Sequence, residues 1–499
     1  MIKGERAKEV WVVLLIVAAA FLLRYWHLSS LGWVDEKSAS YLGMILTDSS
    51  ILHFSDADSY TSMAKDVLEG RGLNLPFNPP MVTFLLIALY KVFGYDYFAA
   101  KIVYALLGSL ALIPVYWVAR ELFGKAVAFA TILLCAGSFT LIMLVGALNI
   151  ENVYLFTLSV AVAAFVALYR ERGLAGKYPL AFAFVFGLCS AAALLTRSEF
   201  ALILAVFFVM GVLKRGWGRA HKAKVAVFAV IGLALALAPY TYRNYVYMAD
   251  FNNQVPSAHL PVFVPVAMNG PFNFVEGHSP YANGTYAPAV AGELKDGYMA
   301  NLNAADPVHL AFLRDGFRIG WEYAKHTPKK ELENLPVKAR VFLRGFANGF
   351  LLNNFMAGME GGSESMADSF VPDSKWLLWL LFALFGVGAV LLCKEGISQK
   401  LLPLAPVGAV LFTCVVFYGL SRLVYPVLPF FFMVASVALV WLWRKLNCAV
   451  AKPYLVAAIV AAVFIVAGFA QSRQRTILAK EPMGGYGKFH LTVLEKVPK

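Results

Sequence analysis

Charged residues are scarce in this chain of 499 residues, of which 15% are Asp, Glu, Lys or Arg and 60% are hydrophobic. An average soluble domain carries about 25% charged residues, so the composition excludes an ordinary soluble protein. The net charge of +13 comes from short basic runs between apolar segments, not from one basic patch. This distribution is typical of membrane topology and argues against nucleic-acid binding. We therefore predict an all-α protein that crosses the membrane many times.

Three other features that the sequence lacks argue against certain classes of protein. The five cysteines lie in or beside apolar segments and lack the spacing of metal ligands, which argues against a zinc site or a disulfide framework. The chain lacks the matching halves or inverted repeats that are typical of transporters. Charges are also missing from the middle of the apolar segments, where a flippase would need a polar path.

Eleven apolar runs are long enough, or nearly so, to span a bilayer, which takes about 20 residues. They are 10–28, 102–119, 126–148, 152–169, 178–195, 199–213, 223–243, 376–393, 401–419, 423–443 and 453–470. A further run, 82–93, is too short to cross, and we predict an interfacial helix there.

The basic residues predict the orientation of the spans. With a cytoplasmic N-terminus, the inner loops carry eighteen Lys and Arg residues and the short outer turns carry two. The first span is predicted to stay uncleaved, because no small-residue cleavage site follows it. A transmembrane domain then covers residues 1–470 in the plasma membrane. Its extracytoplasmic side carries the first loop 29–101 and the large loop 244–375, and a C-terminal tail 471–499 follows on that side.

The large loop is predicted to mix irregular and helical segments. Val255 to Tyr286 contains five prolines and is expected to be irregular, whereas Leu310 to His326 and Leu335 to Asn348 are expected to be helical. Loops of this length usually act as lids or binding elements.

Acids and cations from six separate spans converge on the predicted outer ends of the helices: Asp56, Asp58, Glu151, Lys101, Arg197, Arg243 and Arg422. This set suits a substrate with a phosphate on a lipid tail. The cations would stabilise a leaving phosphate, and a carboxylate would take the proton of an acceptor hydroxyl. Each residue also has a purely structural interpretation. Arg197 would pair with Glu199 in a tight turn, and the cations Arg24, Lys101 and Arg243 would extend to lipid headgroups.

Short motifs then follow one another in a fixed order between about residues 50 and 430. The first loop contains Asp56-Ala57-Asp58-Ser59-Tyr60 and then Asn78-Pro79-Pro80-Met81, and Lys101 follows Ala99-Ala100. Later come Glu151, Thr196-Arg197, Arg243-Asn244, and Arg422 to Pro429 with its prolines at 426 and 429. In this order the motifs resemble GT-C glycosyltransferases of the protein O-mannosyltransferase and aminoarabinose transferase type.

The resemblance implies a GT-C fold and transfer of a sugar from a polyprenyl-phosphate donor to an unknown acceptor. Asp56 would be the catalytic base, and Asp58 and Glu151 would be further catalytic acids. Substrate contacts would come from Tyr60, Lys101, Arg197, Arg243, Arg422 and Tyr425. The chain departs from the family pattern at Asn78, where a basic residue is usual, and at Lys101, which replaces an arginine and loses bidentate phosphate geometry.

Several alternatives stay open at this point. No cofactor is required by the resemblance, but Asp56, Asp58 and Glu151 also form a possible set of oxygen ligands for a divalent metal. The other functions are a flippase for lipid-linked carriers, which would need polar residues through the spans, and a membrane scaffold, which would not need Asp56.

Overall fold

The structure is a computed structural model that describes residues 2–31, 56–146, 148–279, 282–284, 307–348, 375–394 and 399–445. A few side chains within these ranges, including those of Asp56 and Asp58, are not described. All the elements in this part of the chain are helices. The predicted all-α membrane fold is therefore confirmed.

Six helical stretches among the described residues are long and apolar enough to cross a membrane. They are formed by α1 (Ile2–Leu31), α6 (Tyr97–Leu110) with α7 (Leu112–Phe123), α10 (Ile150–Arg170), α12 (Pro179–Thr196), α14 (Arg219–Gln254), and η4 (Ser421–Val427) with α21 (Leu428–Lys445). A seventh would be α8 (Lys125–Gly137) with α9 (Phe139–Met143) and η2 (Leu144–Gly146), which are bent by 68°.

Shorter helices account for most of the remaining predicted runs. They are α5 (Met81–Phe93), α13 (Phe200–Leu213), α19 (Lys375–Lys394) and α20 (Leu404–Val416), with α11 (Leu174–Lys177) and η3 (Gln399–Leu401) in connections. Ten of the eleven runs thus fall on helices, while 453–470 and the tail lie outside the described residues, so the count of eleven spans stays a prediction. The 13 residues of α5 extend about 20 Å, less than a bilayer core of roughly 30 Å.

Helix α14 continues into the segment that was predicted to form the large loop. We expected this loop to open at residue 244, but α14 continues to Gln254 without a break at Arg243. Its 36 residues extend about 54 Å, so the helix is much longer than a bilayer core is thick. The expected irregular segment also contains a helix, α15 (Asn269–Gly277), and α17 (Pro328–Asn348) begins seven residues before the predicted Leu335. The helix predicted at 310–326 is confirmed as α16 (Pro307–His326).

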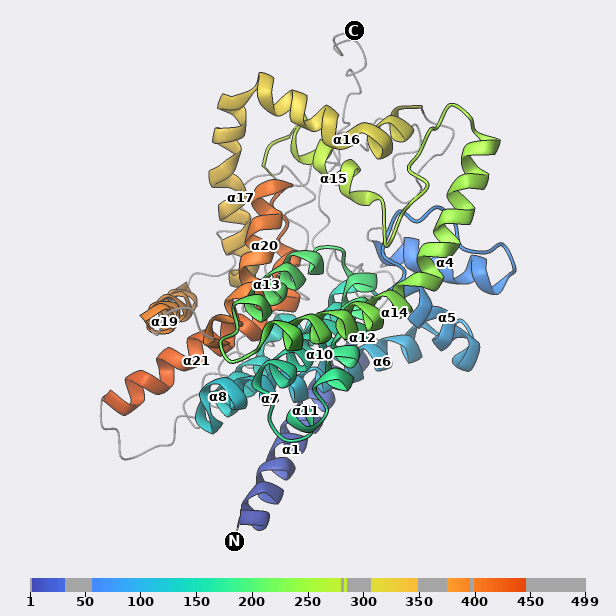
Figure 1. Cartoon of the computed structure of the whole chain (residues 1–499). Helices are drawn as coiled ribbons and strands as arrows, with labels where there is room; N and C mark the ends of the chain where they lie inside the picture. The colour runs from blue at the N-terminus through green and yellow to red at the C-terminus, as the bar shows by residue number, and fades with distance from the viewer. Residues whose placement is uncertain are drawn as a thin grey trace.

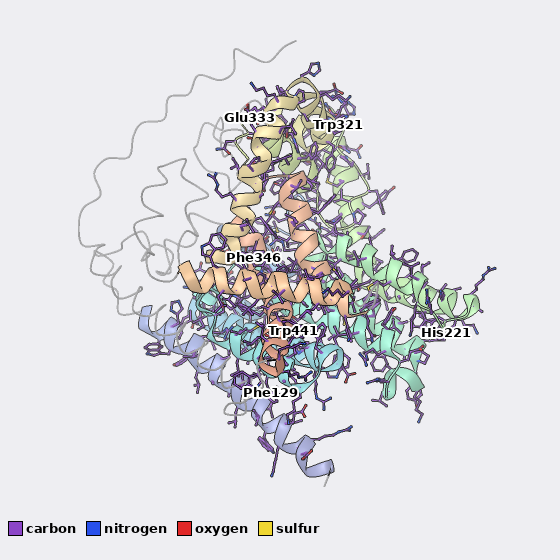
Figure 2. The ribbon with its side chains drawn as sticks, turned by 90° about the vertical axis from the view of Figure 1, so that its left-hand side faces the viewer. Phe129, His221, Trp321, Glu333, Phe346 and Trp441 are labelled. Atoms are coloured by element: carbon purple, nitrogen blue, oxygen red, sulfur yellow. The ribbon has the colours of Figure 1, made fainter. Side chains whose placement is uncertain are left out.

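The helices form a bundle with a separate layer at one end. In Figure 1 the bundle lies below, α15, α16 and α17 lie above it, and α14 continues upward from the bundle. Figure 2 shows Trp321 and Glu333 in this upper layer and Phe129 near the opposite end. The helix α4 (Asp56–Leu68) packs on α5 to one side, where Phe84 of α5 meets the Tyr240 ring of α14 at 5.8 Å. We call α15, α16 and α17 the loop layer.

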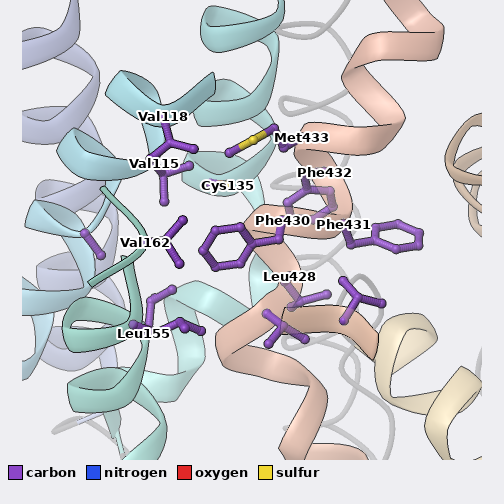
Figure 3. Close-up of a cluster of buried hydrophobic side chains, with 14 of the residues drawn as sticks. Val115, Val118, Cys135, Leu155, Val162, Leu428, Phe430, Phe431, Phe432 and Met433 are labelled. Atoms are coloured by element: carbon purple, nitrogen blue, oxygen red, sulfur yellow. The ribbon is translucent and has the colours of Figure 1, made fainter. Parts of the chain in front are cut away.

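The core of the bundle surrounds α21. Figure 3 shows Phe430 of this helix pointing toward Val162 of α10, while Phe431 points to the other side of the helix, where its ring packs on Phe385 of α19. In the most apolar 18 residues of the stretch Arg422–Lys445, 89% of the residues are buried, the highest share among the candidate spans of the described residues. Arg422 therefore precedes a helix whose position is fixed by packing on several sides.

Glycines allow two of the helices to touch closely. A Cβ built at Gly187 of α12 would lie 2.1 Å from the Ala229 carbonyl oxygen of α14, and one at Gly232 would lie 2.1 Å from the Phe184 oxygen. Small residues of this kind are common where membrane helices cross, because apolar side chains gain little by leaving lipid and association depends on close packing. The α12–α14 contact should not tolerate alanine at either glycine.

Candidate active site

Glu151 lies in the first turn of α10 and is 1% exposed. The helix begins there because Asn149 adopts an extended backbone and its Oδ1 accepts a hydrogen bond from the Ile150 amide at 3.0 Å. A carboxylate in the first turn is favoured by the helix dipole. Burial of that carboxylate costs free energy unless it is paired. The groups around Glu151 therefore determine its chemical role.

Arg422 provides a positive charge beside Glu151. Its Nε lies 3.8 Å from Glu151 Oε1, and a quarter of its side chain is exposed. Arg422 sits in η4, and Pro426 follows within that turn just before α21 begins. Because the proline restricts the backbone and α21 is buried, the direction of the Arg422 side chain is constrained from the C-terminal side.

A second ion pair lies beside the first. Arg197 follows α12, and its Nη2 and Nε donate to the two carboxylate oxygens of Glu199 at 3.0 and 3.2 Å. Its guanidinium also stacks over the Tyr154 ring at 5.6 Å. Electrostatic interactions connect Arg197 with Glu151 and Glu199 with Arg422. The structure thus contains the Arg197–Glu199 pair that the structural interpretation of Arg197 predicted. This pair also interacts electrostatically with Glu151 and Arg422. We call these four residues the Glu151 cluster.

The helix that begins at Asp56 shares a buried hydrophobic group with the start of α10. Tyr60, one turn further along α4, belongs to a buried hydrophobic group that also contains Tyr104 of α6 and Ile150 of α10. The Tyr104 hydroxyl is within electrostatic reach of both Tyr60 and Glu151. Ala57 is fully buried in the same group. The backbone of Asp56 is therefore one helical turn from residues that contact the start of α10.

The roles of several predicted residues stay predictions. The side chains of Asp56 and Asp58 lie outside the described part of the structure. Lys101 is buried on α6, one turn before Tyr104, and Tyr425 is packed in the core of the bundle. Among the described residues there is no group of three His, Cys, Asp or Glu side chains arranged to hold a metal ion. The proposed metal set Asp56, Asp58 and Glu151 falls partly outside those residues.

Arg243 is engaged with the first loop. Its Nη2 donates to the Asn74 carbonyl oxygen at 2.9 Å, and its Nη1 donates to Asn244 Oδ1 at 3.2 Å. The guanidinium also lies over the Tyr247 ring at 4.5 Å. Nearby, the Met268 amide donates to the Pro76 carbonyl at 2.9 Å. These contacts tie the segment between α4 and α5 to α14 and to the residues before α15.

The structural alternative for Arg24, in which it extends toward lipid headgroups, is not what the structure shows. Its side chain is fully buried, and Nη1 donates to the Ala20 carbonyl oxygen at 3.0 Å. The missing side chain of Gly108 on α6 leaves room for it, since a Cβ there would lie 3.4 Å from Arg24 Nε and 3.0 Å from Asn152 Oδ1. His27 follows three residues later, which places it on the same face of α1 as Arg24, and it is also buried. Two polar residues at this spacing in an apolar helix were the sequence feature that could have indicated a buried polar face.

Comparison with known proteins supports this architecture. Residues 78–242 match the family described as dolichyl-phosphate-mannose-protein mannosyltransferase. Archaeal oligosaccharyltransferase AglB from Archaeoglobus fulgidus, in complex with an inhibitory peptide and a dolichol-phosphate, has a similar fold. The TM-score is 0.52 at 15% identity, over 94% of this chain and 56% of that chain. An Archaeoglobus fulgidus oligosaccharyltransferase in complex with Zn and sulfate gives 0.51 at 17% identity, over 92% and 53%.

ArnT from Cupriavidus metallidurans bound to undecaprenyl phosphate matches with a TM-score of 0.36 at 15% identity, over 88% of this chain and 78% of that chain. None of the curated proteins matches this sequence. The chain spans a little over half the length of the archaeal oligosaccharyltransferase. With the family match over residues 78–242, the protein is a multi-pass membrane protein with the GT-C fold of membrane glycosyltransferases.

Proposed function

We propose that this protein transfers a sugar from a polyprenyl-phosphate donor to an acceptor on the extracytoplasmic face of the membrane. The observation that carries the proposal is the Glu151 cluster, together with the buried hydrophobic group that the start of α10 shares with the helix that starts with Asp56. The oligosaccharyltransferase with the same fold is bound to a dolichol-phosphate, which is a ligand of the proposed donor class. In this proposal the cluster and the first turn of α4 face the extracytoplasmic side.

The reaction breaks the bond between the sugar anomeric carbon and the phosphate oxygen. An acceptor hydroxyl or amine attacks that carbon, Asp56 takes its proton, and the polyprenyl phosphate leaves with the bonding electrons. The leaving phosphate gains negative charge during this step, and a cation already in place stabilises it without reorganising. Arg422 suits this role because it is only partly buried and has a planar set of donors for phosphate oxygens.

Glu151 and Arg197 have supporting roles in this proposal. Glu151 holds Arg422 by charge at the start of α10, and the Arg197–Glu199 pair balances the charge of the cluster when no phosphate is bound. Such fixed partners matter because a catalytic group that is displaced by about 1 Å loses much of its effect.

The proposal is tested with purified protein in lipid nanodiscs and a panel of polyprenyl-monophosphate sugars. Wild-type protein should release polyprenyl phosphate and label an acceptor from the same membranes. Asp56→Asn is nearly isosteric and removes the base, so turnover should fall by about 10²–10⁴-fold while donor binding persists. Asp66 lies in the same helix and pairs with Arg71 at the surface, so Asp66→Asn is the matched control and should stay near wild type.

Other outcomes identify the alternatives. Wild-type turnover by Asp56→Asn would remove it as the base. Loss of activity with EDTA and recovery with a divalent metal would favour the metal set Asp56, Asp58 and Glu151. Movement of the labelled lipid across the membrane without sugar transfer would identify a flippase.

A further inference from the structure

The segment that carries Arg422 is held on its N-terminal side by the loop layer. The preceding helix, α20, ends at Val416, and Arg422 follows six residues later. The last carbonyl groups of a helix have no partner within that helix and need donors from elsewhere. Cations are favoured at this end, because the helix dipole is negative there.

Two side chains of the loop layer supply those donors. Lys338 of α17 is 1% exposed, and its Nζ donates to the Val415 carbonyl oxygen at 3.1 Å. His278, directly after α15, places Nε2 at 2.6 Å from the Val416 carbonyl oxygen. Its Nδ1 lies 3.0 Å from a carboxylate oxygen of Glu331 on α17. The His278 ring therefore lies between the end of α20 and Glu331 of α17.

The backbone after α20 is also tightly enclosed. The Gly419 amide donates to the Gly284 carbonyl oxygen at 3.0 Å. A Cβ at Gly419 would lie 3.1 Å from the Lys338 Cα, and one at Gly277 would lie 2.0 Å from the Phe417 carbonyl oxygen. Residues 417–419 are therefore enclosed between α17 and the end of α15, and α17 continues in contact with η4.

We propose that Lys338 and His278 are positioning residues, which fix the end of α20 and thereby aim Arg422 at Glu151. The loop layer then acts on the site through the backbone of residues 415–422. This explains why a lysine is buried where an apolar residue would cost less: its charge interacts with the Val415 carbonyl at the end of α20 and with Glu331 on its own helix. The catalytic part of this inference rests on the proposed function, but the positioning itself does not.

Lys338→Met keeps the length of the side chain and removes its donors. Lys338→Arg restores a cation, and Lys329→Met is the matched control, because Lys329 is exposed on the same helix. The first measurement is hydrogen–deuterium exchange of the purified proteins, followed by mass spectrometry. We expect faster exchange of amides 417–423 in Lys338→Met, and wild-type exchange in Lys329→Met. Lys338→Arg should fall close to wild type. Wild-type exchange at 417–423 in Lys338→Met would overturn the proposal.

The second measurement is turnover with the active donor. Lys338→Met should lower kcat and kcat/KM together by about tenfold, because misaimed Arg422 loses its contact mainly in the transition state. A change in donor KM alone would contradict positioning. If Lys338→Met does not fold, His278→Gln serves in its place, since it retains one donor and should raise exchange at 417–423 by a smaller amount. If wild-type protein transfers no sugar, the proposed function fails while the exchange measurement still decides the positioning role.

Discussion

The two ends of α10 carry one glutamate each and hold them differently. Glu151 in the first turn lies 3.8 Å from a partly exposed arginine. Glu171, directly after the last turn, lies 3.0 Å from His221 Nε2 and 3.3 Å from Lys214 Nζ. Lys214 also lies over the Trp217 ring at 3.9 Å. The Glu171 end is therefore a set of short contacts among partly exposed side chains, whereas the Glu151 end pairs a buried carboxylate over a longer distance with a partly exposed arginine.

The helix dipole explains part of this difference. A carboxylate is favoured at the N-terminus of a helix and opposed at the C-terminus, where carbonyl groups are exposed. Glu171 thus needs nearby cations, and Lys214 donates to both its carboxylate and the Tyr169 carbonyl. Glu151 is favoured by the dipole, which offsets part of the cost of burying its charge. We infer that the Glu171 end maintains the fold, and we propose that Arg422 at the Glu151 end contacts an anionic substrate.

Arg422 should give the largest effect that separates the two ends. Arg422→Ala should cost about 2–4 kcal/mol of transition-state stabilisation, seen as a parallel fall in kcat and kcat/KM. Arg422→Lys should lose less, because a lysine keeps the charge without the bidentate geometry. Wild-type turnover by purified Arg422→Ala would move the phosphate site to Lys101, Arg197 or Arg243.

Glu151→Gln should have an intermediate effect. It keeps the shape of the side chain and removes the charge beside Arg422, so turnover should fall by about tenfold, or about 1.4 kcal/mol. Donor binding measured by fluorescence with a labelled polyprenyl phosphate should change little. A loss as large as that of Asp56→Asn would instead assign Glu151 a direct part in the chemistry.

Glu171→Gln should have the smallest effect, and on stability alone. Burial raises the pKa of Glu171, but the charge of Lys214 and the hydrogen bonds to Lys214 and His221 outweigh it and lower the pKa below its usual value. The stabilisation is then present at neutral pH and is lost as pH falls through the lowered pKa. We expect a loss of about 1 kcal/mol at pH 7, with unchanged turnover. Thermal unfolding monitored by fluorescence should show the difference from wild type shrinking below about pH 4. A constant difference across that range would exclude ionisation of Glu171 as its cause.

The sequence alone determined the class of the protein and most of its helices. Long apolar runs form helices in a membrane because every backbone donor and acceptor must be satisfied within the segment. This local requirement explains why ten of the predicted apolar runs, and the shorter run at α5, are helical. It also brought out Arg197 and Arg422, because charges between apolar runs stand out in the sequence whatever the helices pack against.

Only the tertiary structure decided which of these charges meet. Arg24 and Arg243 both looked like residues for the lipid surface, yet one turns into the bundle beside Gly108 and the other binds the Asn74 carbonyl. The burial of Lys338 and the path of α14 beyond residue 244 were equally hidden. The direction of a side chain on a membrane helix depends on its neighbours, and those neighbours are distant in sequence. The physical reason is that the sequence pattern of one helix shows which residues share a face of that helix. Which other helix packs against that face is decided by close packing between helices.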